Sequence, residues 1–159
     1  MAVTVKTATL DRSPCWENYG DLHRLVFTVN LTMRMEMRDG SLRTVVVTML
    51  PGFRCDGLSV PYVFRWFMKS WDDSNDLYNI AGALHDWLYA TEGNRGMFSR
   101  SECDDIFRGI LREAGKSRKT AGIADWAVGV FAGGSNHWGN DSECIKDLAW
   151  LTVRESAAS

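Results

Sequence analysis

The sequence predicts an α+β fold in which an N-terminal antiparallel β-hairpin, forming a small sheet, packs on three to four helices. Residues 24–38 alternate between apolar and polar side chains, which is typical of a strand with one buried face. Residues 75–91 and 100–114 instead carry apolar side chains at helical spacing. The chain has 159 residues, 45% of them hydrophobic, so we expect a single domain over 1–159.

Residues 1–21 allow two interpretations. Ser13-Pro14 and the segment 18–21 are turn signals on either side of Cys15 and Trp16. The segment fits either an edge strand followed by a loop or an arm that orders on a partner, and the sequence leaves both open.

A β-hairpin is predicted next. The alternating strand 24–38 is followed by Asp39-Gly40, a pair that tolerates the positive φ angles of a tight turn. The return strand, 42–49, is rich in β-branched residues.

A bend then interrupts regular structure. Two glycines and two prolines fall within residues 51–61, which requires a specific backbone path. One interpretation is an ordered turn capped by Asp56 and Ser59. The other is a loop that covers the helix carrying His85 and lines a site, with Asp56, Gly57 and Ser59 as its binding residues.

The helix predicted over 75–91 carries the central candidate residues. His85 and Tyr89 lie one turn apart on the flank of its apolar stripe, and Asp86 points away from the stripe. Residues 93–96 end the helix with C-terminal cap chemistry.

A second helix should begin at Arg100, because Ser99 and Glu102 fit a capping box, and it should stop at Gly115. Its spacing places Asp104 on the flank of the apolar stripe, as a carboxylate that can be buried. It places Asp105 on the opposite, solvated face.

Two more helices are expected towards the C-terminus. A helix over 117–132 is rich in small residues and should pack closely on its neighbours. A short last helix is expected over 142–153, within a C-terminal helix and tail that span 139–159.

Two antiparallel helices joined by a short loop can bring His85 beside Asp104. A carboxylate that accepts the Nδ1 proton of histidine would leave Nε2 to activate water, and Tyr89 would hold Asp104 in place. Asp86 would be free to bind a cation. The alternative is a buried His–Asp–Tyr network that only pins the two helices together.

Composition excludes some classes of protein. The net charge of −2 and a pI near 5.9 argue against nucleic-acid binding. No apolar run approaches the roughly 18 residues of a transmembrane segment, and the N-terminus lacks the order of a signal peptide, so we expect synthesis in a cytoplasm. The four scattered cysteines are expected to be small buried apolar residues, and the seven tryptophans favour a contact surface for a partner.

Three motifs resemble a family of uncharacterised phage and prophage proteins, the DUF1353-like proteins. They lie in residues 47–61, 83–89 and 99–107, where the family's patterns are GFxTDGASxP, HDxLY and SRxxADxxF. This chain has Cys55 and Leu58 in place of the usual Thr and Ala of the first pattern. The likeness covers roughly residues 22–138. It implies a protein made in a host cytoplasm, possible association with the virion, and partners among other phage proteins or the host envelope.

The pair of helices is also similar to the core of phospholipases A2, in which a histidine activates water and the next aspartate binds calcium. That resemblance implies catalytic roles for His85, Asp104 and Tyr89, with Asp86 as a calcium ligand. The leading hypothesis is therefore a phage protein that hydrolyses an ester or amide in the host envelope. The alternatives are a non-enzymatic virion component of a tail or baseplate, and a small inhibitor of a host factor.

Overall fold

A computed structural model describes residues 1–55, 71–117, 120–122 and 151–156, and within them the fold is α+β, as predicted. The order of elements is β1 (Thr4–Leu10), β2 (Trp16–Tyr19), β3 (Leu22–Leu25), β4 (Val29–Glu36), β5 (Leu42–Met49), β6 (Arg54–Cys55), α1 (Asp76–Ala90), α2 (Glu92–Gly96), α3 (Arg100–Glu113) and β7 (Leu151–Glu155).

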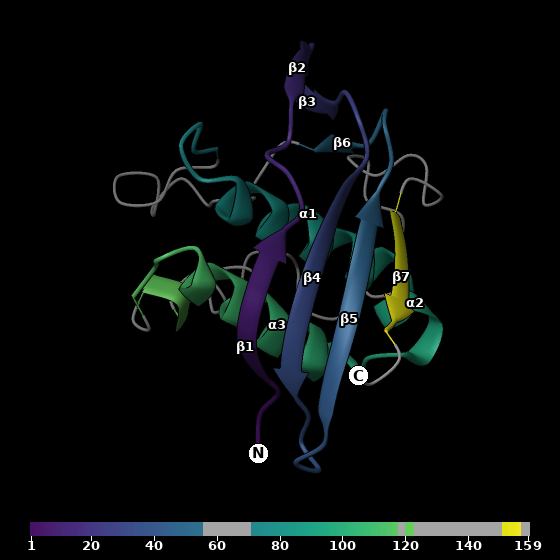
Figure 1. Ribbon diagram of the computed structural model, residues 1–159, viewed down its shortest axis with the longest axis vertical. Helices are drawn as coiled ribbons and strands as arrows, with labels where there is room; N and C mark the ends of the chain where they lie inside the picture. The colour runs from purple at the N-terminus through teal and green to yellow at the C-terminus, as the bar shows by residue number, and fades with distance from the viewer. Residues whose placement is uncertain (56–70, 118–119, 123–150, 157–159) are drawn as a thin grey trace.

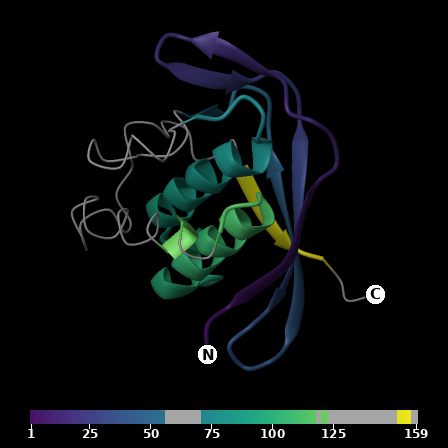
Figure 2. The same ribbon diagram turned by 90° about the vertical axis from the view of Figure 1, so that its left-hand side faces the viewer.

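The strands of the described residues form two sheets. The larger has the order β1-β4-β5-β7 and the smaller the order β2-β3-β6, and the pairs within each are antiparallel. Helices α1 and α3 cover one face of the larger sheet, while the smaller sheet lies beyond one end of it (Figure 1). Figure 2 shows the same two layers from the side.

The hairpin between β4 and β5 is confirmed. Leu31 pairs with Val47 and Met33 with Val45, so the buried side chains of both strands share the face that meets the helices. Gly40 adopts a φ of 82° in the turn, where Asp39 Oδ1 accepts hydrogen bonds from the Ser41 amide and hydroxyl.

The single strand predicted over 24–38 is wrong, because the chain changes sheets after Leu25. Leu25 donates its amide proton to the carbonyl of Phe53, and the Val26 amide donates to Cys15. Pairing in the larger sheet resumes at Val29. Alternation of apolar and polar residues shows which side chains are buried, but it does not show which strand lies beside them. A single alternating pattern can therefore cover two strands that belong to different sheets.

The edge-strand interpretation of the N-terminal segment holds for β1, which pairs with β4 at the border of the larger sheet. The following residues form β2 of the smaller sheet. The cysteines within the described residues divide: Cys55 and Cys103 are buried as expected, but Cys15 is exposed, since it lies in the connection between β1 and β2.

The prediction of a last helix over 142–153 is wrong for residues 151–153. These belong to β7, where Val153 pairs with Val47 and completes the larger sheet beside β5. Without β7, the backbone N–H and C=O groups along one side of β5 would be unpaired, which favours a strand at residues 151–155. The pattern of residues 142–153 contains no information about this distant partner. Residues 142–150 lie outside the described part. Of the helix expected over 117–132, residues 117 and 120–122 are described. Residues 120–122 are helical, while Ser117 precedes the helix and its hydroxyl accepts a hydrogen bond from the Thr120 amide.

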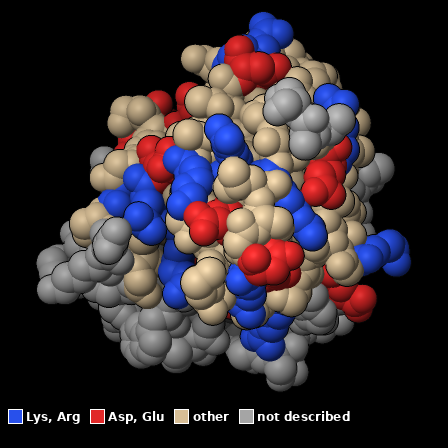
Figure 3. Space-filling model, turned by 60° about the horizontal axis from the view of Figure 1, so that its bottom comes forward, with Lys and Arg blue, Asp and Glu red and all other residues tan. Residues whose placement is uncertain are grey.

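The surface in Figure 3 mixes basic and acidic side chains over its described part rather than collecting one sign of charge. Two exposed ion pairs join neighbouring strands of the larger sheet: Lys6 pairs with Glu36 at 2.6 Å and Arg43 with Glu155 at 3.6 Å. Such exposed pairs contribute little to stability.

Helix α3 approaches the sheet most closely at Gly109. A Cβ added there would lie 2.6 Å from the Cβ of Val5 in β1, which has little freedom to move. We therefore expect Gly109→Ala to lower the free energy of unfolding by about 1–3 kcal/mol, the usual cost of overpacking a core. Urea unfolding measures this, with Gly122→Ala as the control because no atom of the described residues lies within 4 Å of its added Cβ. Equal losses in the two variants would contradict the close packing of Gly109 against Val5.

Candidate functional site

Helices α1 and α3 lie side by side and run antiparallel, as predicted. At one end Asn75, the N-cap of α1, donates from its side-chain amide to the carbonyl of Ala114, just after α3. At the other end Arg100, the first residue of α3, donates to Tyr89 near the end of α1. The capping box is present: Ser99 Oγ accepts from the Glu102 amide, and the Glu102 carboxylate accepts from the Ser99 amide.

This arrangement brings His85 and Asp104 into contact, with 3.0 Å between His85 Nε2 and Asp104 Oδ1. The predicted contact is therefore present, but the prediction that Nδ1 would face Asp104 is wrong. The ring packs against Tyr89 and Phe107, at centroid distances of 4.3 and 4.9 Å, and this packing turns Nε2 towards α3. Nδ1 instead faces Asp86, whose Oδ1 lies 3.9 Å away.

Tyr89 supports Asp104 as predicted. Its hydroxyl donates to Asp104 Oδ1 at 2.6 Å, so one carboxylate oxygen faces both the phenol and the imidazole. Burial and the hydrogen bond to Asp104 raise the pKa of Tyr89, which keeps the phenol protonated and able to donate.

His85 and Asp104 stabilise each other's charged forms. Burial of the ring opposes its protonation, but the hydrogen bond to Asp104 and the nearby Asp86 carboxylate outweigh burial and raise the pKa of His85. Burial also opposes the ionisation of Asp104, yet the hydrogen bonds from His85 and Tyr89 lower its pKa. The resting pair is thus an imidazolium beside a carboxylate until the pH exceeds the raised pKa of His85.

These shifts predict how stability depends on pH. The contribution of His85 is fully present below its unfolded pKa of about 6.5 and disappears as the pH rises through the higher folded value. The contribution of Asp104 is present above about pH 4 and disappears as the pH falls through its lower folded value. Urea unfolding should therefore show the largest difference between wild type and His85→Asn between about pH 4 and 6.5. A difference that grows above that range would contradict the raised pKa of His85.

Asp86, the predicted metal ligand, has a side chain that is 30% exposed, and it makes no hydrogen bond to another described residue. The described residues contain no group of three or more His, Cys, Asp or Glu side chains placed to hold a metal ion. The predicted binding residues Asp56, Gly57 and Ser59 lie outside the described residues, and so does the bend predicted to cover the site.

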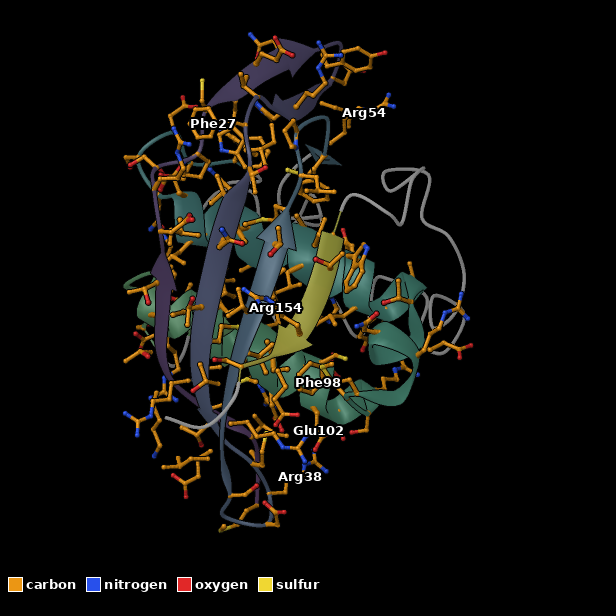
Figure 4. The ribbon with its side chains drawn as sticks, turned by 45° about the vertical axis from the view of Figure 1, so that its right-hand side comes forward. Phe27, Arg38, Arg54, Phe98, Glu102 and Arg154 are labelled. Carbon is orange, nitrogen blue, oxygen red and sulfur yellow. The ribbon has the colours of Figure 1, made fainter. Side chains whose placement is uncertain are left out.

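Asp105 is buried, so the prediction of a solvated carboxylate is wrong. One of its oxygens accepts from the Val3 amide at 2.9 Å and from Arg38 at 3.2 Å, and Arg108 binds the other. Arg38 reaches this position from the β4–β5 hairpin, near the start of α3 (Figure 4). Spacing along one helix could not show that the start of β1 would cover this face. The result is that α3 is fixed against the sheet with Asp104 turned towards α1.

Arg100 is a site residue that the sequence reasoning missed. Its Nε donates to the Tyr89 hydroxyl at 3.3 Å, and its guanidinium carbon lies 5.5 Å from the centre of the Tyr89 ring. The signal was available, because Arg100 precedes Asp104 by four residues and therefore shares its face of the helix.

The comparisons with known proteins give one match. A family model described as "Protein of unknown function (DUF1353)" matches residues 29–128, a span that includes every described residue of the site. No curated protein and no solved structure matches. Among the described residues, no helix combines the length and the hydropathy needed to cross a bilayer.

Proposed function

The chain belongs to the DUF1353 family, and from this premise we propose that it is a phage or prophage hydrolase with a phospholipase-A2-like His–Asp site. Its substrate would be an ester or amide of the host envelope. The observation that carries the proposal is the pairing of His85 Nε2 with Asp104, which leaves Nδ1 without a hydrogen bond from any described residue.

The geometry supports Nδ1 as the atom that would act as the base. When the ring is neutral, its Nε2 proton is donated to Asp104, so Nδ1 holds the lone pair. Nδ1 would take a proton from water while the water oxygen bonds to the carbonyl carbon of the substrate. The imidazolium, stabilised by Asp104, would then return that proton to the leaving alcohol or amine as its bond to carbon breaks. Because the pKa of His85 is raised, the rate should increase with pH until the ring is neutral.

Calcium is part of the proposal through Asp86. This carboxylate is partly exposed and adjacent to Nδ1, which suits a cation that orients a substrate oxygen. Calcium takes about six to eight oxygen ligands, and the described residues offer one carboxylate here. The described ligand set is incomplete, so the steps above use the protein's own side chains alone.

The test compares wild type with His85→Asn on phospholipid vesicles and on purified cell walls, with calcium and with a chelator. We expect wild type to release fatty acid or a wall fragment and His85→Asn to lose about 10²–10⁴-fold of that rate, the usual contribution of a general base. Arg112→Gln, an exposed change on α3, is the matched control and should keep the wild-type rate. A wild type that is inert on both substrates would remove the proposal.

A second candidate function is a non-enzymatic virion component in which the same network is structural. The observation that favours it is the burial of His85, of which 3% is exposed. In that case His85→Asn and Asp104→Asn would weaken folding by about 1–3 kcal/mol, the cost of leaving a buried polar group unpaired. Virion assembly would then fall in proportion to folded protein, and the protein would be recovered in purified particles.

A further inference from the structure

We propose that Arg100 is a positioning residue that acts through Tyr89 to hold the Asp104 carboxylate against His85 Nε2. The inference rests on the proposed function only for its consequence for catalysis. The arrangement itself concerns the described hydrogen bonds and can be tested in the absence of any substrate.

The four side chains form two matched pairs. His85 and Tyr89 are separated by one turn of α1, and Arg100 and Asp104 by one turn of α3, so each pair occupies one helix face. The helices are antiparallel, which sets His85 opposite Asp104 and Tyr89 opposite Arg100. Tyr89 also reaches Asp104, and its hydroxyl therefore lies between Arg100 and Asp104.

The hydrogen bonds among Arg100, Tyr89 and Asp104 have a defined donor and acceptor at each step. The Tyr89 proton is donated to Asp104 at 2.6 Å, so the phenol oxygen has only lone pairs left to offer. Arg100 Nε–H donates to that oxygen at 3.3 Å. A donor on the phenol oxygen polarises the O–H bond and strengthens its donation to Asp104. Arginine is suited to this role because its guanidinium keeps its charge at every relevant pH.

A positioning role and a simple charge effect predict opposite changes at His85. A cation near the imidazole disfavours its protonation, so removing a charge that acts only through space would raise the pKa of His85. If Arg100 instead holds Tyr89 and Asp104 in place, its removal lets the carboxylate move away from Nε2. The hydrogen bond that raises the pKa of His85 then weakens, and the pKa falls.

The experiment is a pH titration of His85 by NMR in the full-length protein with a chelator present throughout, so that no cation at Asp86 contributes to the shift, and with the resonance assigned by its loss in His85→Asn. We expect Arg100→Met to lower the pKa of His85 by about half a unit or more, as the loss of a charged hydrogen bond does. Arg112→Met is the matched control, because Arg112 is exposed on the same helix, and it should leave the pKa unchanged. Tyr89→Phe should also lower it, and adding Arg100→Met to Tyr89→Phe should lower it no further.

An unchanged or raised pKa in Arg100→Met would overturn the proposal, as would a further fall of similar size in the double variant. Should Arg100→Met fail to fold, Arg100→Ala makes the same test without the longer apolar side chain. The two proposals can fail separately. The wild type could be inert on vesicles and cell walls while the pKa of His85 still falls in Arg100→Met. The hydrolase would then be wrong while the positioning role of Arg100 stands.

Discussion

Asp104→Asn is expected to reduce hydrolysis by about 10⁴-fold, the scale seen when an asparagine replaces the aspartate that orients a catalytic histidine. The substitution keeps the size of the side chain but removes the charge that stabilises the imidazolium. It also allows an amide NH₂ group to face Nε2, at 3.0 Å in the wild type, which would place the proton of the neutral ring on Nδ1. The base would then lose its lone pair.

Initial rates at equal concentrations of folded protein measure this effect. Glu113→Gln is the matched control, because it removes an exposed carboxylate from the same helix and should leave the rate unchanged. An Asp104→Asn variant as active as wild type would show that the pair contributes nothing to the reaction.

Gly93→Ala is expected to lower the free energy of unfolding by about 3 kcal/mol or more, and to separate the two site helices. Gly93 lies in the short link between α1 and α3 with a φ of 64°, a left-handed conformation that costs a residue with a Cβ about 1–2 kcal/mol. The added Cβ would also overlap the carbonyl oxygen of Phe98 and lie 2.9 Å from its carbonyl carbon. Relief of this clash requires the start of α3, and with it Asp104, to move.

Gly96→Ala provides the control for Gly93→Ala within the same link. Gly96 also has a positive φ, of 93°, but within the described part of the chain no atom lies within 4 Å of its added Cβ. It should therefore show only the conformational cost, about 1–2 kcal/mol. Thermal and urea unfolding of both variants measure the difference, and equal losses would mean that the close approach to Phe98 is not what makes Gly93 necessary.

The features that the sequence predicted correctly depend on neighbours along the chain. Asp39-Gly40 specifies its own turn, and Ser99 with Glu102 specifies the start of α3. The contact between His85 and Asp104 could also be predicted, because a short link between two amphipathic helices forces their flanks together. In each case the determining residues lie within about one turn of a helix, one hairpin, or one pair of helices joined by a short link.

The features that were missed depend on partners far away in the chain. The spacing along α3 predicted that Asp105 is solvated, but the Val3 amide and the Arg38 side chain donate hydrogen bonds to it and it is buried. Leu151 was predicted to lie in a helix, but its segment pairs with β5 as a strand. The orientation of the His85 ring was missed for the same reason, since it depends on packing against Phe107 of the other helix. Local spacing carries no information about these contacts.

The central claim is that Asp104 holds Nε2 of His85 and leaves Nδ1 as the basic nitrogen. Nitrogen-15 NMR of histidine-labelled protein tests it directly, because the chemical shifts of the two ring nitrogens report which of them carries the proton. At a pH above the His85 titration, we predict that Nε2 is protonated and Nδ1 is not, and that Asp104→Asn disturbs this preference. A neutral ring with its proton on Nδ1 in the wild type would contradict the account.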